Sequence, residues 1–183
     1  AETGNSVITL ADRMDAGLVL GQSSRPIERT QTAGELHDLL AADGPALVLD
    51  VLDRHAAGTL DPVQQDESLV TLAPKLSRAD AVIDLADPAD RVRARINGLS
   101  PWPGVAARLG NVTLKLLRAD SEQTGVDAPP GTLVDPARGL VACAEGSALR
   151  LLEVQPAGGR PMPWPDFARG HAAAADQTLA CPP

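Results

Sequence analysis

The sequence has 183 residues, of which 44% are hydrophobic and 2% aromatic, and its formal net charge is -8. This length fits one large domain or two small ones with an aliphatic core, and the acidity argues against a general nucleic-acid binder. The charge is uneven, however. Residues 1–77 carry 5 basic and 12 acidic residues, a balance of -7, whereas residues 78–183 carry 11 and 12, a balance of -1. The later part can therefore still present a local basic face.

The cysteines and the motif content exclude several classes of protein. Cys143 and Cys181 form neither a metal-binding spacing nor a disulfide framework, which favours a reduced, cytoplasmic setting. No apolar run approaches the length of a membrane span. The sequence also contains no glycine-rich phosphate loop, HExxH pair or serine nucleophile elbow.

The chain begins with two short β-branched and apolar segments, residues 6–10 and 18–22, which are predicted strands. The loop between them contains Asp15, followed by Ala16 and Gly17. An Asp before Ala-Gly is typical of a turn, but a loop beside two strands is also a usual place for site chemistry. The first strand follows the first residue almost directly and no Met precedes it, so we expect the chain to continue upstream in a longer protein.

Two helices are predicted next. Thr32 and Glu35 form a capping box at the start of the first, and Gly44-Pro45 is expected to end it and begin the second. Gly58 is the expected C-terminal cap. Residues 59–73 have no helical period and are predicted to be an extended linker, followed by a small basic spot at Lys75 and Arg78.

A third helix is predicted after Asp87, which would cap it, with Pro88 as its first residue. Asp87 can pair with Arg91, and Asp90 with Arg93, so part of the positive charge of this helix is expected to be neutralised within it.

The bend Pro101-Trp102-Pro103 follows, and it admits two interpretations. It is either a seam between two folding units or a corner that holds a buried tryptophan. Beyond it the pattern favours a small barrel or sandwich of short strands, with a frayed tail after His171. The expected strands are residues 112–118, 131–134, 139–143 and 148–155.

Several short motifs in a fixed order carry a family resemblance. They include Met14-Asp15-Ala16-Gly17, Gln65-Asp66-Glu67, Ala73-Pro74-Lys75-Leu76-Ser77, Pro101-Trp102-Pro103 and Leu151-Leu152-Glu153-Val154-Gln155-Pro156-Ala157-Gly158. In order and spacing they resemble the C-terminal portion of the methionyl-tRNA formyltransferases. The resemblance implies that residues 1–58 are the α/β tail of a Rossmann-like formyltransferase domain, 59–77 a linker, and 78–183 an OB-like barrel domain that binds tRNA.

The resemblance also implies a reaction. The amino group of methionine on the initiator tRNA attacks the formyl carbon of 10-formyltetrahydrofolate, and the family uses an Asn, a His and an Asp. Asp15 matches that Asp as a catalytic residue, and Met14 with Asp15 would lie against the folate. Lys75, by its family motif, and Arg78, Arg95 and Arg118, by their charge, are the candidate tRNA contacts. We expect a cytoplasmic monomer with no metal ion and no membrane contact.

The family's Asn and His lie upstream of the point where this chain begins, so the chain alone is expected to be inactive. Two alternatives stay open. The barrel could bind RNA without catalysis, or the formyl acceptor could be an amino sugar instead of methionyl-tRNA.

Overall fold

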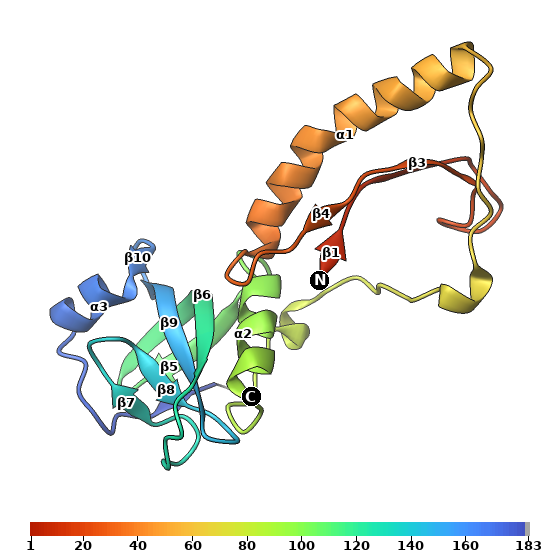
Figure 1. Ribbon diagram of the computed structural model, residues 1–183. Helices are drawn as coiled ribbons and strands as arrows, with labels where there is room; N and C mark the ends of the chain where they lie inside the picture. Colours follow the sequence, from red (N-terminus) through yellow and green to blue (C-terminus); the bar gives the residue numbers. More distant parts are fainter. Residues whose placement is uncertain (182–183) are drawn as a thin grey trace. The chain divides into compact units, whose positions relative to one another are not determined.

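The computed structural model describes residues 1–181 (Figure 1). By its internal contacts the chain forms two compact units. Unit 1 comprises residues 1–28 and 35–75, and unit 2 comprises residues 29–34 and 76 onward. The segment 59–75, the greater part of the linker predicted over 59–77, therefore packs with unit 1. It contains a single 3-10 turn, η1 (Glu67–Leu69), capped by the Asp66 carboxylate, which accepts a hydrogen bond from the Ser68 N–H at 2.9 Å.

Unit 1 is built on two antiparallel strand pairs. Strands β2 (Ser6–Ile8) and β3 (Val19–Gln22) form a hairpin, which confirms the two predicted strands, and β1 (Glu2–Thr3) pairs with β4 (Arg25–Pro26). The register of the hairpin shifts between Val7 and Ile8, so the strands leave their regular pairing just before the loop that contains Asp15.

One helix, α1 (Ala33–Ala56), replaces the two helices expected from Gly44-Pro45. The prediction was wrong, because the chain stays helical through Pro45. Pro45 removes one N–H from the helical ladder. The carbonyl of Leu40, in the turn before Pro45, accepts a hydrogen bond from Asn5 Nδ2 at 2.8 Å, so this turn is held from outside.

Helix α1 lies directly on strand β3. A Cβ placed on Gly21 would lie 2.7 Å from Val51 Cγ2, so the helix can approach this closely only because residue 21 has no side chain. Arg54 Nη2 donates to the Leu20 carbonyl at 3.0 Å, and Arg25 forms an ion pair with Asp43 at 2.7 Å. These contacts fix one face of the helix.

The opposite face of α1 is apolar and exposed. Val51 is the one buried residue of the helix, whereas Val48, Leu49 and Leu52 are 44%, 61% and 55% exposed. Leu10 and Met14, in the loop of the hairpin, are also exposed. Unit 1 therefore leaves several large apolar side chains exposed.

Unit 2 is a curled antiparallel half-barrel sheet with the strand order β11-β5-β6-β9-β8-β7, and β10 pairs with β9 (Figure 1). It confirms the strand-rich pattern predicted for this half, but it begins earlier than expected, with β5. The strands are β5 (Val105–Leu109), β6 (Val112–Gln123), β7 (Leu133–Asp135), β8 (Leu140–Ala142), β9 (Ser147–Pro156), β10 (Met162–Pro163) and β11 (Leu179–Ala180).

The two edges of this sheet are joined by the C-terminal segment. The Leu179 N–H donates to the Gly131 carbonyl, and the Leu133 N–H donates to the Gln177 carbonyl, both at 2.8 Å. Leu179 is 1% exposed. The frayed tail predicted after His171 was therefore wrong, because burial of Leu179 and these backbone bonds order the segment.

Helix α2 (Ala89–Gly98) packs on the sheet through a buried asparagine. Asn97 is 2% exposed, its Nδ2 donates to the Ala119 carbonyl, and its Oδ1 accepts from the Ala119 N–H, both at 2.9 Å. The register of β6 against β9 shifts on each side of Arg118 and sets Ala119 opposite Leu151, whereas β5 pairs with β6 only as far as Leu116, so Ala119 has no partner strand on that side. Asn97 supplies the missing partner for both of its groups.

The start of α2 differs from the prediction by one residue. Pro88, not Asp87, precedes the first helical residue, and the Ala89 N–H donates to Ser147 Oγ at 2.9 Å. The expected ion pairs did form. Asp87 lies 3.2 Å from Arg91, and Asp90 lies 3.0 Å from Arg93.

The two tryptophans have opposite environments. Trp102 is 55% exposed, so the interpretation of this bend as a corner with a buried ring was wrong. Trp164, the first residue of α3 (Trp164–Gly170), is fully buried, packs beside Phe167 with ring centroids 5.3 Å apart, and donates from Nε1 to the Pro136 carbonyl at 2.8 Å. A Cβ on Gly139 would lie 2.7 Å from its ring.

We expect Asn97→Ala to lower the free energy of unfolding of unit 2 by about 3 kcal/mol, because it leaves a buried N–H and a buried carbonyl without partners. Both tryptophans belong to unit 2, so their fluorescence during urea unfolding measures this change. Asn111→Ala, at an exposed position, is the control. A difference between the two variants below about 0.5 kcal/mol would contradict this role of Asn97.

A second prediction separates steric from conformational cost at Gly139. Gly139 and Gly158 have nearly equal backbone angles, φ 71° and 73°, but a Cβ on Gly158 would meet nothing within 4 Å. Both alanine variants should lose about 1 kcal/mol from the left-handed backbone. Gly139→Ala should lose about 1–3 kcal/mol more, because the methyl group displaces Trp164. Equal losses in the same fluorescence assay would refute the close packing.

Candidate functional site

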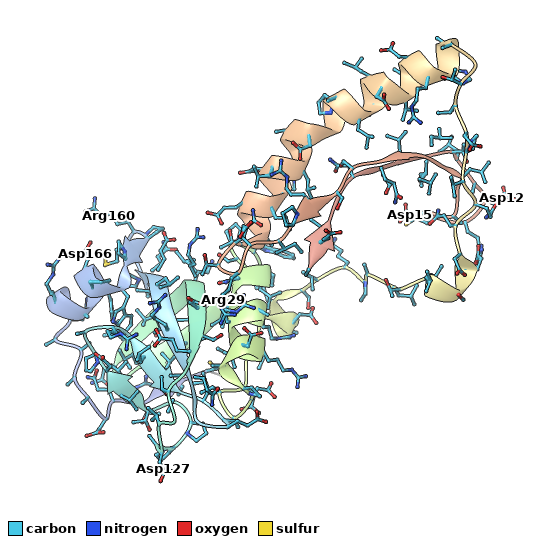
Figure 2. All side chains as sticks on the ribbon, in the orientation of Figure 1. Asp12, Asp15, Arg29, Asp127, Arg160 and Asp166 are labelled. Carbon is cyan, nitrogen blue, oxygen red and sulfur yellow. The ribbon has the colours of Figure 1, made fainter. Side chains whose placement is uncertain are left out.

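The loop between β2 and β3 places Asp15 at a sharp turn. Asp15 has φ 58°, in the left-handed region that Asp tolerates better than most residues, and its side chain is exposed. Met14, beside it, is 92% exposed. Figure 2 shows Asp12 and Asp15 on this same loop. Within residues 1–181 the carboxylate of Asp15 has no hydrogen-bond partner, so its acceptor oxygens are available to a ligand or another side chain.

The glycine after Asp15 has a steric role. A Cβ on Gly17 would lie 1.8 Å from the Thr9 carbonyl oxygen, so only glycine permits the two sides of the hairpin to approach here. Thr9 also closes the loop, since its Oγ1 accepts from the Leu18 N–H at 2.9 Å and its N–H donates to the Leu18 carbonyl at 3.0 Å. The hairpin can thus close only with glycine at position 17, two residues after Asp15.

Residues from the predicted linker complete this loop. Gln65 Nε2 donates to the main-chain carbonyls of Asp15 at 2.6 Å and of Gly17 at 2.7 Å. Glu67 forms an ion pair with Arg13 at 2.6 Å. Gln65-Asp66-Glu67 is one of the motifs that carry the family resemblance, but no contact was predicted for it. Nothing local in the sequence shows that these residues pack against a loop 50 residues earlier.

Two of the four predicted tRNA contacts are engaged within unit 2. Arg95 Nη2 donates to the Asp80 carbonyl at 2.5 Å and its Nε donates to the Val82 carbonyl. Arg118 Nη1 donates to the Thr30 carbonyl at 2.9 Å and its Nε lies 3.9 Å from Glu153. These side chains therefore hold neighbouring segments on α2 and the sheet.

The other two candidates, Lys75 and Arg78, are exposed. Among the residues that the structure describes, neither side chain has a carboxylate partner. Arg78 begins the 3-10 turn η2 (Arg78–Asp80), where Ser77 and Asp80 form a reciprocal capping box. The hydrogen bonds from the Ser77 side chain and backbone lower the pKa of Asp80.

Many arginines of unit 2 are neutralised in one ionic network over β6 and β9. Asp120 lies 2.7 Å from Arg29 and 2.9 Å from Arg150. Burial opposes ionisation of Asp120, but the Ser121 N–H and Arg29 bond its carboxylate, and the charges of Arg29 and Arg150 add to this, so its pKa falls below the usual value. The remaining pairs are Arg29–Asp90, Arg93–Asp90, Arg150–Glu122 and Arg138–Glu122.

A second set of cations, not predicted from the sequence, lies on the outward face of the sheet. Lys115 and Arg108 project from β6 and β5 at diagonal positions, because Lys115 pairs with Ala106 and Arg108 with Thr113. Both are exposed, and in the described part of the chain neither has a carboxylate partner, while Arg108 Nε donates to the Gly110 carbonyl at 2.9 Å. Alternation of apolar and polar residues along β5 and β6 is the sequence signal that could have located this face.

This outward face adjoins the exposed tryptophan. A Cβ on Gly104 would lie 3.2 Å from Lys115 Cε, so the lysine side chain lies across the end of the bend that carries Trp102. Arg160, in the loop after β9, is exposed as well and is labelled in Figure 2. We call Arg108, Lys115 and Arg160 the outer basic set.

None of the helices formed by residues 1–181 combines the length and apolar character needed to cross a membrane. The same residues bring together no group of three or more His, Cys, Asp or Glu side chains able to hold a metal ion.

Comparisons with known proteins agree on one family. The family model described as "Formyl transferase, C-terminal domain" matches residues 75–172. The methionyl-tRNA formyltransferase of Roseiflexus castenholzii is 40% identical over 173 residues, which cover 93% of this chain and 55% of that protein. The corresponding enzyme of Methylococcus capsulatus is 38% identical over 174 residues, 94% of this chain and 56% of that protein. The chain thus spans about half the length of these relatives.

Solved structures show the same fold at low identity. HypX from Aquifex aeolicus, in complex with tetrahydrofolic acid, has a TM-score of 0.66 and 16% identity over 95% of this chain and 31% of that chain. An N-formyltransferase from Helicobacter canadensis, in complex with folinic acid and dTDP-3-aminofucose, has a TM-score of 0.67 and 12% identity over 82% of this chain and 55% of that chain. Together with the family model, which matches more than half of the sequence, these findings show that the chain belongs to the formyl transferase family and contains its C-terminal domain.

Proposed function

We propose that this chain is the C-terminal portion of an enzyme that transfers a formyl group from 10-formyltetrahydrofolate to the amino group of methionyl-initiator tRNA. One observation carries the proposal: relatives named methionyl-tRNA formyltransferase align with nearly all of the chain at 38–40% identity. On this proposal, unit 1 is the tail of a Rossmann-like formyltransferase domain, and unit 2 is an OB-like domain that binds tRNA in a cytoplasmic enzyme.

The uncovered apolar surface of unit 1 supports a role within a longer protein. Leu49 and Leu52 on α1, and Leu10 in the hairpin loop, are more than half exposed, whereas unit 2 buries most of its large apolar residues in one core. An upstream formyltransferase segment that packs on this surface would remove it from water. That segment would also supply the Asn and His that the reaction requires.

Asp15 is the residue of this chain that we assign to the chemistry. The folate donor supplies an electrophilic formyl carbon, and the attacking amine must lose a proton. The free carboxylate of Asp15 can accept a hydrogen bond from an imidazole supplied upstream, which orients that ring and favours its protonated form. Met14, with its exposed apolar side chain, fits the rim of a site for a flat folate ring.

For the tRNA, we propose Lys75 and Arg78 together with the outer basic set. Arg95 and Arg118, the other two candidates, already donate to backbone carbonyls of unit 2, which makes them less available to phosphates. The net charge of -8 is consistent with a tRNA contact limited to these cations, since the acidic chain as a whole would repel a polyanion.

The likeness to the Helicobacter canadensis enzyme keeps an amino-sugar acceptor as a second candidate, although at 12% identity that likeness concerns the fold alone. To separate the two candidates, the chain joined to its upstream formyltransferase segment is offered both methionyl-tRNA and a nucleotide-linked amino sugar. Formylation of the sugar but not of the tRNA would overturn the main proposal. Binding of tRNA without formylation of either acceptor would leave an RNA-binding module.

We expect Asp15→Asn to lower kcat at least about 100-fold, because the isosteric amide cannot carry the negative charge that orients and stabilises the imidazole. The assay uses the chain joined to its upstream formyltransferase segment, with methionyl-tRNA and 10-formyltetrahydrofolate. Asp12→Asn, which makes the same change of charge on the same exposed loop, is the matched control and should stay within about twofold of the parent. Equal kcat values for the two variants would refute the role of Asp15.

The tRNA surface has a separate test on the 183-residue chain. The double variant Arg108→Ala/Lys115→Ala should bind tRNA more weakly, and the slope of log K against log salt concentration should fall by about 1.5 as two phosphate contacts are lost. Arg91→Ala/Arg169→Ala removes the same charge from arginines that already pair with carboxylates, so its slope should be unchanged. Equal slopes for the two double variants would exclude the outer basic set as the contact.

A further inference from the structure

We propose that Gln65 is a positioning residue for Asp15, so that the segment after α1, residues 59–75, contributes to the site. The inference rests on the proposed function, since it concerns the same loop. It starts from the two hydrogen bonds that one side-chain amide directs at the main chain of the Asp15 turn, 2.6 Å to the Asp15 carbonyl and 2.7 Å to the Gly17 carbonyl.

The turn needs an external restraint. Asp15 is held at φ 58°, a conformation that a residue with a side chain adopts reluctantly. Its own backbone support is weak, since the one turn bond, from the Ala16 N–H to the Arg13 carbonyl, is 3.4 Å long. The two bonds from Gln65 are shorter and fall on each side of Ala16. They therefore hold the peptide groups that determine where the Asp15 side chain points.

Gln65 is itself held firmly. Val63, two residues earlier, exchanges two backbone hydrogen bonds with Val19 on β3, at 2.8 and 2.9 Å. The Gln65 side chain is half-buried, in contrast to the exposed Gln64 beside it. An anchored backbone and a partly covered side chain limit the rotamer freedom that would otherwise weaken the two bonds.

The ion pair between Arg13 and Glu67 explains the fixed conformation of the loop less well than the two Gln65 bonds do. Its side chains are 71% and 56% exposed, and pairs this exposed contribute little because water screens them. The Gln65 bonds reach the carbonyls of exposed Asp15 and of buried Gly17, and the bond to the buried residue carries more weight. Unlike the ion pair, they also act on the main chain of Asp15 itself.

The sharpest variant is Gln65→Glu. Glutamate has the same shape, but an ionised carboxylate has no proton to donate and meets two carbonyl oxygens instead. Gln64→Glu adds the same charge one residue away, at an exposed position, and is the matched control. Gln65→Ala tests the loss of the bonds without the added charge.

The first readout is hydrogen exchange of the amides at residues 15–18 in the 183-residue chain. Gln65→Glu and Gln65→Ala should each speed exchange by roughly tenfold or more, because two hydrogen bonds that close the loop are lost. Gln64→Glu should leave the rates unchanged. Unchanged exchange in both Gln65 variants overturns the inference, and this result does not depend on any enzymatic activity.

The second readout is the kinetics of the chain joined to its upstream segment. Gln65→Glu should lower kcat about tenfold and leave the KM for methionyl-tRNA within about twofold, because a misplaced Asp15 affects the transition state more than tRNA binding. A rise in KM with kcat unchanged, or values equal to those of Gln64→Glu, would overturn the positioning role. If the parent itself transfers no formyl group, the proposed function fails, and the exchange rates alone decide whether Gln65 orders the loop.

Discussion

The docking of α2 on the curled sheet depends on one buried amide. Asn97 forms two hydrogen bonds with the backbone of Ala119, at the point where the register of β6 shifts. Strand β5 pairs with β6 only as far as Leu116, so the N–H and carbonyl of Ala119 have no strand partner on that side, and they would be costly to bury unpaired. The side chain that satisfies them also fixes the position of α2, so the point where β6 loses its neighbouring strand becomes the site where the helix is attached. Without Asn97 these buried backbone groups would be unsatisfied.

The charges of unit 2 show a division between structural and available cations. Arg29 and Arg150 converge on Asp120, which is kept ionised by them in spite of burial, and Arg118 reaches the carbonyl of Thr30. Counting arginines in the sequence therefore overestimates the basic surface. The cations without a carboxylate partner in the described chain lie elsewhere, on the outward face of β5 and β6 and in the segment that enters unit 2. An acidic protein can present a local positive surface in this way while its total charge remains negative.

Local patterns in the sequence predicted local structure well. The two strands around Asp15, the ion pairs of Asp87 and Asp90 within α2, and the strand-rich second half followed from periodicity and spacing of residues. The expected break at Pro45 did not occur, and Asn5, 40 residues earlier, bonds the turn before the proline, a contact that no local pattern shows. The burial of Trp164 and the order of Leu179 were also missed. Each depends on a partner distant in the sequence, Gly139 in one case and Gly131 in the other, and no local pattern reveals that partner.

The same limit applies to the candidate site, where it has a chemical consequence. Asp15 was identified from the sequence because its loop matches a family motif, but the sequence could not show what holds that loop. The structure places the restraint in Gln65, within a segment whose composition is typical of a linker. A free carboxylate in an exposed turn is useful for catalysis only if its position is fixed, since small displacements of a reacting group are costly. Segment 59–75 is therefore better understood as a strap on the Asp15 loop that also continues into unit 2. The Val63–Val19 backbone bonds anchor this strap on β3, so the conformation of the Asp15 turn depends on residues 50 positions later in the sequence.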